Sequence, residues 1–130
     1  MPALKGIERY KYLQDVNVSG NNLTTLKPLS AIKHLIKLNA SYNALTTILD
    51  FSPPANLEWA DFSRNQITKI TNCGLFPYLK HLFLDENQIS KIEGLNINKS
   101  LITLSLRANK IETIENLDDL WLEDLNLSQN

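Results

Sequence analysis

The chain has 130 residues, with 43% hydrophobic and 21% charged side chains and a formal net charge of −1 at pH 7. This composition is typical of a soluble globular protein, and the small net charge argues against nucleic-acid binding and against docking on an anionic membrane. Apolar runs are only a few residues long, whereas a membrane helix needs about 20, and the N-terminus lacks an apolar signal segment. We therefore expect a cytoplasmic protein.

One motif recurs from residue 13 onward. Six segments fit L-x-x-L-x-L-x-x-N, with other apolar residues at some of the leucine positions. The alternation of apolar and polar residues predicts a short strand with one buried face in each segment. The segments begin at residues 13, 35, 57, 79, 101 and 122, so the spacing is 22 residues except for a last step of 21.

This spacing is the pattern of a leucine-rich repeat. It predicts an α/β solenoid with short parallel strands on the concave face and 3₁₀ or irregular arms on the convex face. No repeat can cover its own leucines, so stability must come from neighbouring repeats.

The two ends of the chain stop partway through a repeat. Residues 1–12 match the second half of a repeat, five repeats start at residues 13, 35, 57, 79 and 101, and residues 122–130 form a truncated repeat. Terminal repeats normally need a polar cap, and no arm or polar capping segment follows Asn130. We therefore expect residues 1–130 to be a leucine-rich repeat domain within a longer protein.

An asparagine closes each segment. Its amide both donates and accepts hydrogen bonds, which suits a sharp corner with otherwise unpaired backbone groups. We interpret this column of asparagines as structural; its members are Asn21, Asn43, Asn65, Asn87, Asn109 and Asn130.

Most outward positions of the predicted strands hold small polar residues, but Trp59 and Phe83 are large aromatics. They fall on adjacent strands, about 8 Å apart by strand geometry, with His81 beside Trp59. Exposed aromatics of this kind are typical binding hot spots, so we predict that a protein partner binds this concave face. The alternative is that the rings cover each other or a flanking segment of the same protein. The residues predicted to surround them are Lys37, Tyr42, Asp61, Arg64, Asp85 and Arg107.

Charge is uneven along the chain. Residues 1–80 carry nine basic and five acidic side chains, whereas residues 81–130 carry four and nine. The acidic stretch 112–124 suggests docking of a basic partner segment, although a solvated acidic edge explains it equally well.

The sequence contains no recognisable motif for phosphate binding, metal binding or nucleophilic catalysis. No two of the four glycines are closer than 14 residues, so a phosphate-binding loop is not expected. His34 and His81 lack metal-ligand spacing, and the single cysteine, Cys73, falls in phase with core positions and is expected to be an inert buried thiol. We therefore expect no catalytic, cofactor-binding or metal-binding residues and no enzymatic activity.

The repeat form LxxLxLxxNxIxxIxxLxxL resembles the 22-residue subclass typified by the regulatory subunit of type-1 protein phosphatase. The Asn39-Ala40-Ser41 strand and the Phe51-x-Pro53-Pro54 step also resemble the repeat region of proteins that combine leucine-rich repeats with a guanylate kinase domain. Relatives of this kind are commonly ciliary or flagellar scaffolds, which implies a non-catalytic scaffold or docking module in such an assembly. Two alternatives stay open: regulation of a type-1 phosphatase, and targeting of an attached guanylate-kinase-like domain. The sequence indicates no particular oligomeric state.

Overall fold

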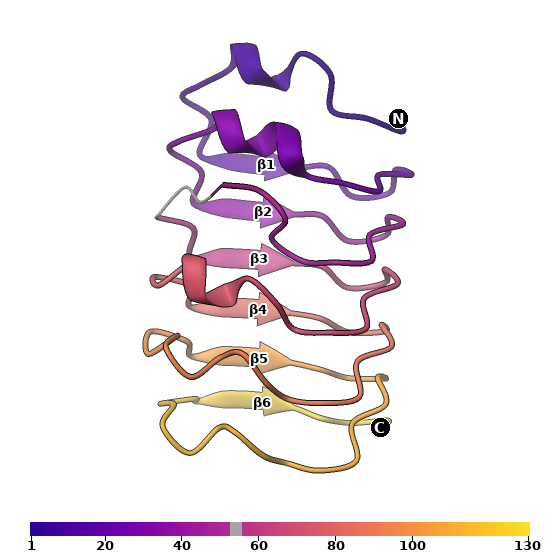
Figure 1. Cartoon of the computed structure of the whole chain (residues 1–130), viewed down its shortest axis with the longest axis vertical. Helices are drawn as coiled ribbons and strands as arrows, with labels where there is room; N and C mark the ends of the chain where they lie inside the picture. The colour runs from indigo at the N-terminus through magenta and orange to yellow at the C-terminus, as the bar shows by residue number, and fades with distance from the viewer. Residues whose placement is uncertain (53–55) are drawn as a thin grey trace.

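The computed structural model describes residues 1–52 and 56–130 as a stack of similar turns, so Pro53 and Pro54 of the resemblance lie outside the described residues. Within the described residues, each turn from residue 13 onward contributes one three-residue strand, and six such strands form one parallel sheet in chain order (Figure 1). The predicted leucine-rich repeat solenoid is confirmed. The strands are β1 Asp15–Asn17, β2 Lys37–Asn39, β3 Trp59–Asp61, β4 His81–Phe83, β5 Thr103–Ser105 and β6 Asp124–Asn126.

The register of the sheet follows the repeat spacing. Trp59 pairs with His81, and Asp61 pairs with Phe83, each 22 residues further along the chain. Because side chains alternate along a strand, the central residue of every strand points to the same side. That residue is buried in β1 to β5, as in Leu82 of β4.

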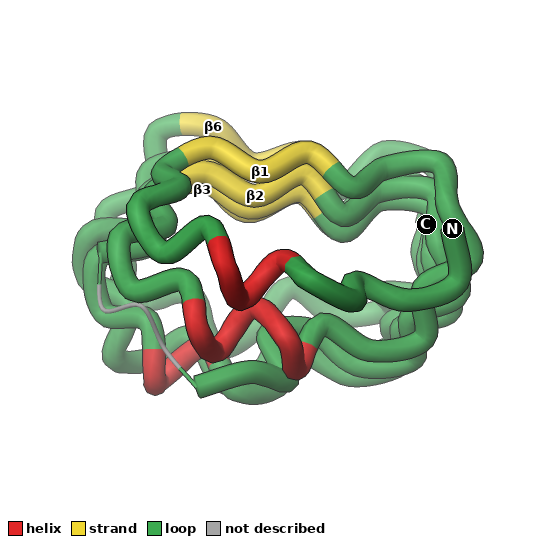
Figure 2. The backbone as a smooth tube through the Cα atoms, turned by 90° about the horizontal axis from the view of Figure 1, so that it is seen from above, coloured by secondary structure: helices red, strands yellow, loops and turns green. Residues whose placement is uncertain are grey.

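The described residues contain three short 3₁₀ helices. η1 Ile7–Arg9 precedes β1, and η2 Lys27–Ala31 and η3 Cys73–Leu75 lie in arms that return from one strand to the next. Pro28 lies in the first turn of η2, where its fixed φ suits a helix start. Figure 2 shows the strands on one side of the stack and the helices opposite them. Across the described ranges, no helix has the length and apolar character needed to span a bilayer.

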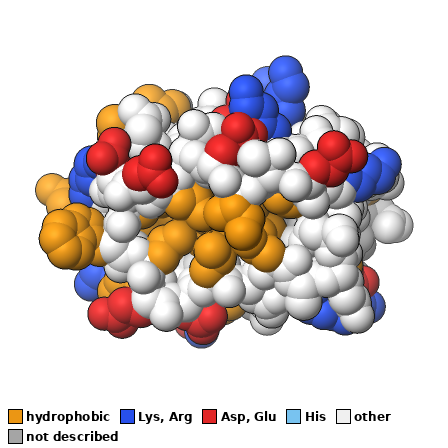
Figure 3. All heavy atoms as spheres, turned by 90° about the horizontal axis from the view of Figure 1, so that it is seen from below, with side chains coloured by type: hydrophobic (Ala, Val, Ile, Leu, Met, Phe, Trp, Pro, Cys, Tyr) orange, Lys and Arg blue, Asp and Glu red, His pale blue; other side chains and the backbone are white. Residues whose placement is uncertain are grey.

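The core is one column of apolar side chains between the sheet and the arms. Its bulkiest fully buried members are Phe62 and Phe76. In the last turn the equivalent leucines are only partly covered, and Leu125 of β6 is 39% exposed. Figure 3 accordingly shows hydrophobic side chains gathered in the middle of the face at this end of the stack.

The asparagine column lies at the corner that follows each strand. Asn87 donates from Nδ2 to the carbonyl oxygens of Phe62 (3.1 Å) and Leu84 (3.0 Å), and its Oδ1 accepts from the backbone N–H of Ile67 (3.0 Å). Each such asparagine therefore joins its own turn to the preceding one. The same pattern recurs at Asn43, Asn65, Asn109 and Asn130, and Asn21 instead accepts from the N-terminal ammonium.

Candidate protein-binding face of the sheet

The outward side chains of the strands, together with the second residue after each strand, form a surface that we call the sheet face. Strand pairing brings Lys37, Trp59 and His81 side by side across β2, β3 and β4. Phe83 lies at the far end of β4, opposite Asp61. The register thus places the aromatic residues on neighbouring strands at diagonal positions.

The rings of Trp59 and Phe83 are in contact. Their centroids are 5.3 Å apart at an interplanar angle of 47°, which is shorter than the 8 Å expected from backbone spacing because the two side chains lean toward each other. Both rings are half-buried. Lys37 Nζ lies 4.7 Å from the Trp59 ring centroid, a cation–π distance, so an apolar pair and a cation form one contiguous surface.

His81 extends this cluster toward β5. Its Nδ1 lies 3.0 Å from Thr103 Oγ1 on the neighbouring strand. The hydrogen bond holds the imidazole across the sheet beside Trp59, with one ring nitrogen already engaged. His34, by contrast, stacks on Tyr12 outside the sheet face, so the two histidines do not form one site.

The edge of the sheet face is held by short side-chain-to-backbone hydrogen bonds. In β1, β2 and β6 the last strand residue is asparagine, and its Oδ1 accepts from the backbone N–H and hydroxyl of the serine two residues later. In β3 the same place is taken by Asp61, which accepts from the backbone N–H of Ser63 at 2.8 Å. These local bonds satisfy backbone donors at the strand end.

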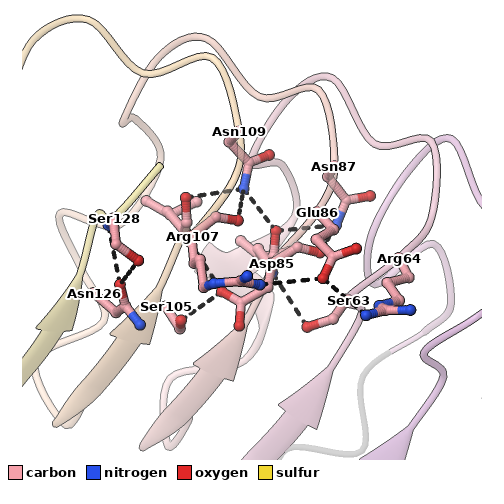
Figure 4. Close-up of polar contacts among 12 residues, drawn as sticks. Ser63, Arg64, Asp85, Glu86, Asn87, Ser105, Arg107, Asn109, Asn126 and Ser128 are labelled. Carbon is pink, nitrogen blue, oxygen red and sulfur yellow. Dashed lines mark hydrogen bonds and ion pairs between the residues drawn. The ribbon is translucent and has the colours of Figure 1, made fainter. Parts of the chain in front are cut away.

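Phe83 in β4 and Ser105 in β5 depart from this arrangement, and the neighbouring turns compensate (Figure 4). Phe83 has no acceptor, so the backbone N–H of Asp85 donates to Ser63 Oγ at 3.2 Å. Asp85 Oδ1 then accepts from the Ser105 hydroxyl and from the backbone N–H of Arg107. Asp85, predicted as a rim residue, is therefore tied into the backbone of the next turn.

A second line of side chains runs along the corner beside the asparagine column. The Arg64 guanidinium stacks on Tyr42 with Cζ 4.6 Å from the ring centroid. Arg64 and Arg107 each lie 3.1 Å from the same oxygen of Glu86, as Figure 4 shows. Sequence reasoning predicted Tyr42, Arg64 and Arg107 here but missed Glu86, although it holds the same repeat position as Tyr42 and Arg64.

Most of the remaining predicted residues lie apart from the sheet face. Cys73 is fully buried in the core, and burial raises its pKa to about 12. The acidic side chains Asp118, Asp119 and Glu123 are exposed, whereas Asp124, also exposed, is the first residue of β6 and lies on the sheet face opposite Thr103. Among the described residues, no group of three or more His, Cys, Asp or Glu side chains is arranged to hold a metal ion.

The fold matches solved leucine-rich repeat proteins. Internalin C2 of Listeria monocytogenes is 25% identical with a TM-score of 0.88, over 98% of this chain and 57% of that one. The leucine-rich repeat domain of APL1B is 28% identical with a TM-score of 0.80, over 95% and 37% of the two chains. TLR13, solved as a complex with ssRNA13, is 29% identical with a TM-score of 0.78, over 91% and 18%.

The chain thus spans little more than half the length of internalin C2 and smaller shares of the other two. The sequence matches no protein-family model and no curated protein.

The chain therefore has the leucine-rich repeat fold, in which stacked repeats present an extended surface for binding. Proteins with this fold are typically non-catalytic interaction modules.

Proposed function

We propose that this chain is a protein-interaction module whose partner binds the sheet face over Trp59 and Phe83. The observation that carries this proposal is the replacement of polar residues by an aromatic pair at positions that are polar elsewhere. The position of Trp59 is threonine in β5, and the position of Phe83 is asparagine in β2. The fold does not require rings there.

Phe83 also removes a hydrogen-bond acceptor that β1, β2, β3 and β6 all possess. Departures from a local structural rule concentrate at functional positions. The Ser63 hydroxyl oxygen accepts from the Asp85 backbone N–H in place of the missing side-chain acceptor. A ring retained at such a position supports a role outside the fold itself.

The arrangement suits a hot spot. Two rings in contact offer a rigid apolar surface, and Lys37 places a cation at its edge. Truncating such residues in an interface typically costs about 2 kcal/mol or more each, which is roughly a 30-fold loss in affinity. The alternative is that Trp59 and Phe83 only cover each other, in which case their removal would leave binding unchanged.

The test replaces the pair by residues that the repeat itself uses. We expect Trp59→Thr with Phe83→Asn to keep the fold, because Thr103 and Asn39 occupy these positions in other turns. Partners captured from cell extract by the unaltered chain would be purified and titrated by calorimetry. We expect the double variant to bind at least about 30-fold more weakly.

Ile114→Thr provides the matched control, because Ile114 is 71% exposed and lies on an arm. It should leave affinity unchanged. If every purified partner binds the double variant as tightly as the unaltered chain, the sheet face is not the docking surface.

The 22-residue repeat supports a more specific setting. It motivates the proposal of a cytoplasmic scaffold in a ciliary or flagellar assembly, which imaging of the tagged protein would test; an exclusively nuclear signal would contradict it.

The same repeat form supports regulation of a type-1 phosphatase, which predicts that the phosphatase co-purifies with the chain. Targeting of a guanylate-kinase-like domain predicts coding sequence for a Gly-rich phosphate loop after residue 130.

The exposed acidic side chains near the last turn support a subsidiary contact with a basic segment of the partner. Asp118→Lys with Asp119→Lys should then weaken binding most at low salt, because exposed charges are screened as salt rises. An unchanged salt dependence would identify this stretch as a solvated edge.

A further inference from the structure

A second surface runs along the side of the stack where each arm meets the next strand. It consists of the residue just before the first leucine of each motif, and we call it the edge row. In Figures 1 and 2 this side lies opposite the chain termini, where the strands begin. The edge row comprises Tyr12, His34, Asn56, Tyr78, Ser100 and Trp121.

The fold does not need rings in the edge row. Asn56 and Ser100 fill the same position in other turns, so a small polar residue is sufficient there. The rings are also far from buried, with Tyr12 86%, Tyr78 55% and Trp121 79% exposed. Because the row runs along the side of the stack, stacking of turns does not cover it. Large exposed aromatics of this kind mark interaction sites.

The first two turns combine these rings with positive charge. Tyr12 stacks on His34 with ring centroids 5.8 Å apart and an interplanar angle of 15°. Arg9, Lys11 and Lys33 are exposed beside them. In residues 1–52 and 56–130, none of the ion pairs involves these three cations.

The surface beside Tyr12 also contains a pocket. This shallow pocket is lined by Arg9, Tyr10, Lys11, Tyr12 and Leu13. Tyr10 is 62% exposed at its rim. The nearby carboxylate of Glu8 accepts a hydrogen bond from the backbone N–H of Gly6 at 3.0 Å, so it is engaged within its own arm. The pocket therefore combines apolar and aromatic side chains with two cations, Arg9 and Lys11.

We propose that this N-terminal part of the edge row docks an extended acidic segment of a partner protein. Carboxylates of that segment pair with Arg9, Lys11 and Lys33, while an apolar or aromatic side chain packs on Tyr10 and Tyr12. The charge complementarity is local. Beside Tyr78 the lysine Lys80 is paired with Glu58, and beside Trp121 the cation Lys99 is outnumbered by Asp118 and Asp119. The proposed site therefore comprises the first two turns.

A protein segment fits this surface better than a single-stranded nucleic acid. Nucleic-acid grooves combine a track of cations for the phosphates with ring faces open for successive bases. Here Tyr12 and His34 each cover one face of the other, and the cations further along the row lie beside carboxylates, Lys80 beside Glu58 and Lys99 beside Asp118 and Asp119. The surface is separate from the sheet face, so its occupation goes beyond the proposed function.

Fluorescence anisotropy with the full 130-residue chain tests the proposal. The probe is a fluorescein-labelled copolymer of Glu and Tyr, and a Lys and Tyr copolymer serves as the control for sign. We expect the acidic probe to bind, the basic probe not to bind, and binding to weaken as NaCl is raised. Lys11→Glu with Lys33→Glu should reduce affinity about tenfold or more.

Two further variants locate the contact. Tyr12→Ser, which introduces the residue found at Ser100, should weaken binding several-fold without loss of thermal stability, because Tyr12 is almost fully exposed. Lys69→Glu with Lys110→Glu makes the same charge change at exposed arm positions and should leave affinity unchanged. An equal loss in this control would show attraction to overall charge and would overturn the proposal.

The remaining outcomes are also decisive. Unchanged binding in the Lys11 and Lys33 double variant would overturn the edge site alone and would leave the proposed sheet-face function standing. Loss of copolymer binding in the Trp59→Thr and Phe83→Asn variant would move the contact to the sheet face. Tighter binding of single-stranded poly-U than of the acidic copolymer, lost with the same two lysines, would replace the protein partner by a nucleic acid.

Discussion

At the scale of single residues, a few polar side chains hold the stack together from inside. An interior asparagine of the column satisfies backbone groups in two turns at once, as Asn87 does for Phe62, Leu84 and Ile67. Asp85 does similar work on the sheet face, where it accepts from Ser105 and Arg107. The same residue types on the surface would contribute little, because water satisfies exposed groups equally well.

Replacing Asn87 by alanine should therefore lower the free energy of unfolding by about 1–3 kcal/mol, because buried backbone groups of two turns lose their partners. Urea denaturation followed by circular dichroism measures this change. Asn96→Ala is the matched control, since Asn96 is exposed and its replacement should alter stability by less than about 0.5 kcal/mol. Equal effects of the two substitutions would show that the column is not structural.

At the scale of elements, the corners of the arms depend on residues with positive φ. Asn72, Gly94 and Asn116 occupy the same position of successive turns, with φ of 63°, 74° and 61°. The two asparagines donate from Nδ2 to Ile48 and Ile92 carbonyl oxygens of the preceding turns. At Gly94 the backbone itself comes close to the preceding turn, since an added Cβ would lie 2.9 Å from the Ile70 carbonyl oxygen.

Gly94→Ala should consequently destabilise the chain by at least about 1 kcal/mol more than Gly20→Ala. Both glycines have positive φ, so both substitutions introduce the left-handed strain of roughly 1–2 kcal/mol. Only Gly94 adds a steric clash, because nothing lies within 4 Å of a Cβ at Gly20. Thermal unfolding measures the stability lost in each variant. Equal losses of stability in the two variants would mean that the arm at Gly94 shifts freely to accommodate the added Cβ.

At the scale of the whole molecule, stability is distributed along one dimension. Each interior turn is covered on both sides, whereas β6 and its arm are covered on one side and keep partly exposed leucines. Repeat proteins of this kind behave as sums of turn stabilities and nearest-neighbour contacts. The turns should therefore open from the end inward rather than all together.

Native-state hydrogen exchange tests this opening from the end by comparing the exchange rates of two backbone amides that form equivalent hydrogen bonds in different turns. The Phe62 amide donates to Phe83, and the Leu106 amide donates to Asn126, both at 2.8 Å. We expect the Leu106 amide to exchange about tenfold faster or more, because its acceptor lies in the last turn. Equal protection of the two amides would instead indicate a single cooperative opening of the whole stack.

The repeat period was sufficient to predict the architecture. A constant spacing places the same apolar residues inward in every turn, and a strand with one buried face has only one compatible register. That Trp59, His81 and Phe83 lie close together on adjacent strands follows from this register alone. The asparagine column could be identified in the same way, since one residue type recurred at one corner.

The repeat spacing could not predict which side chains of adjacent turns are in contact. The 5.3 Å ring contact depends on how Trp59 and Phe83 lean, and the shared ion pair at Glu86 depends on two arginines reaching the same oxygen. Asp85 anchors the next turn because its Oδ1 accepts from the Arg107 N–H, which in β1, β2 and β6 is the role of the last strand residue. Periodicity specifies which face a side chain occupies, whereas its partner is chosen by rotamer and by the neighbouring turn, which only the folded stack provides.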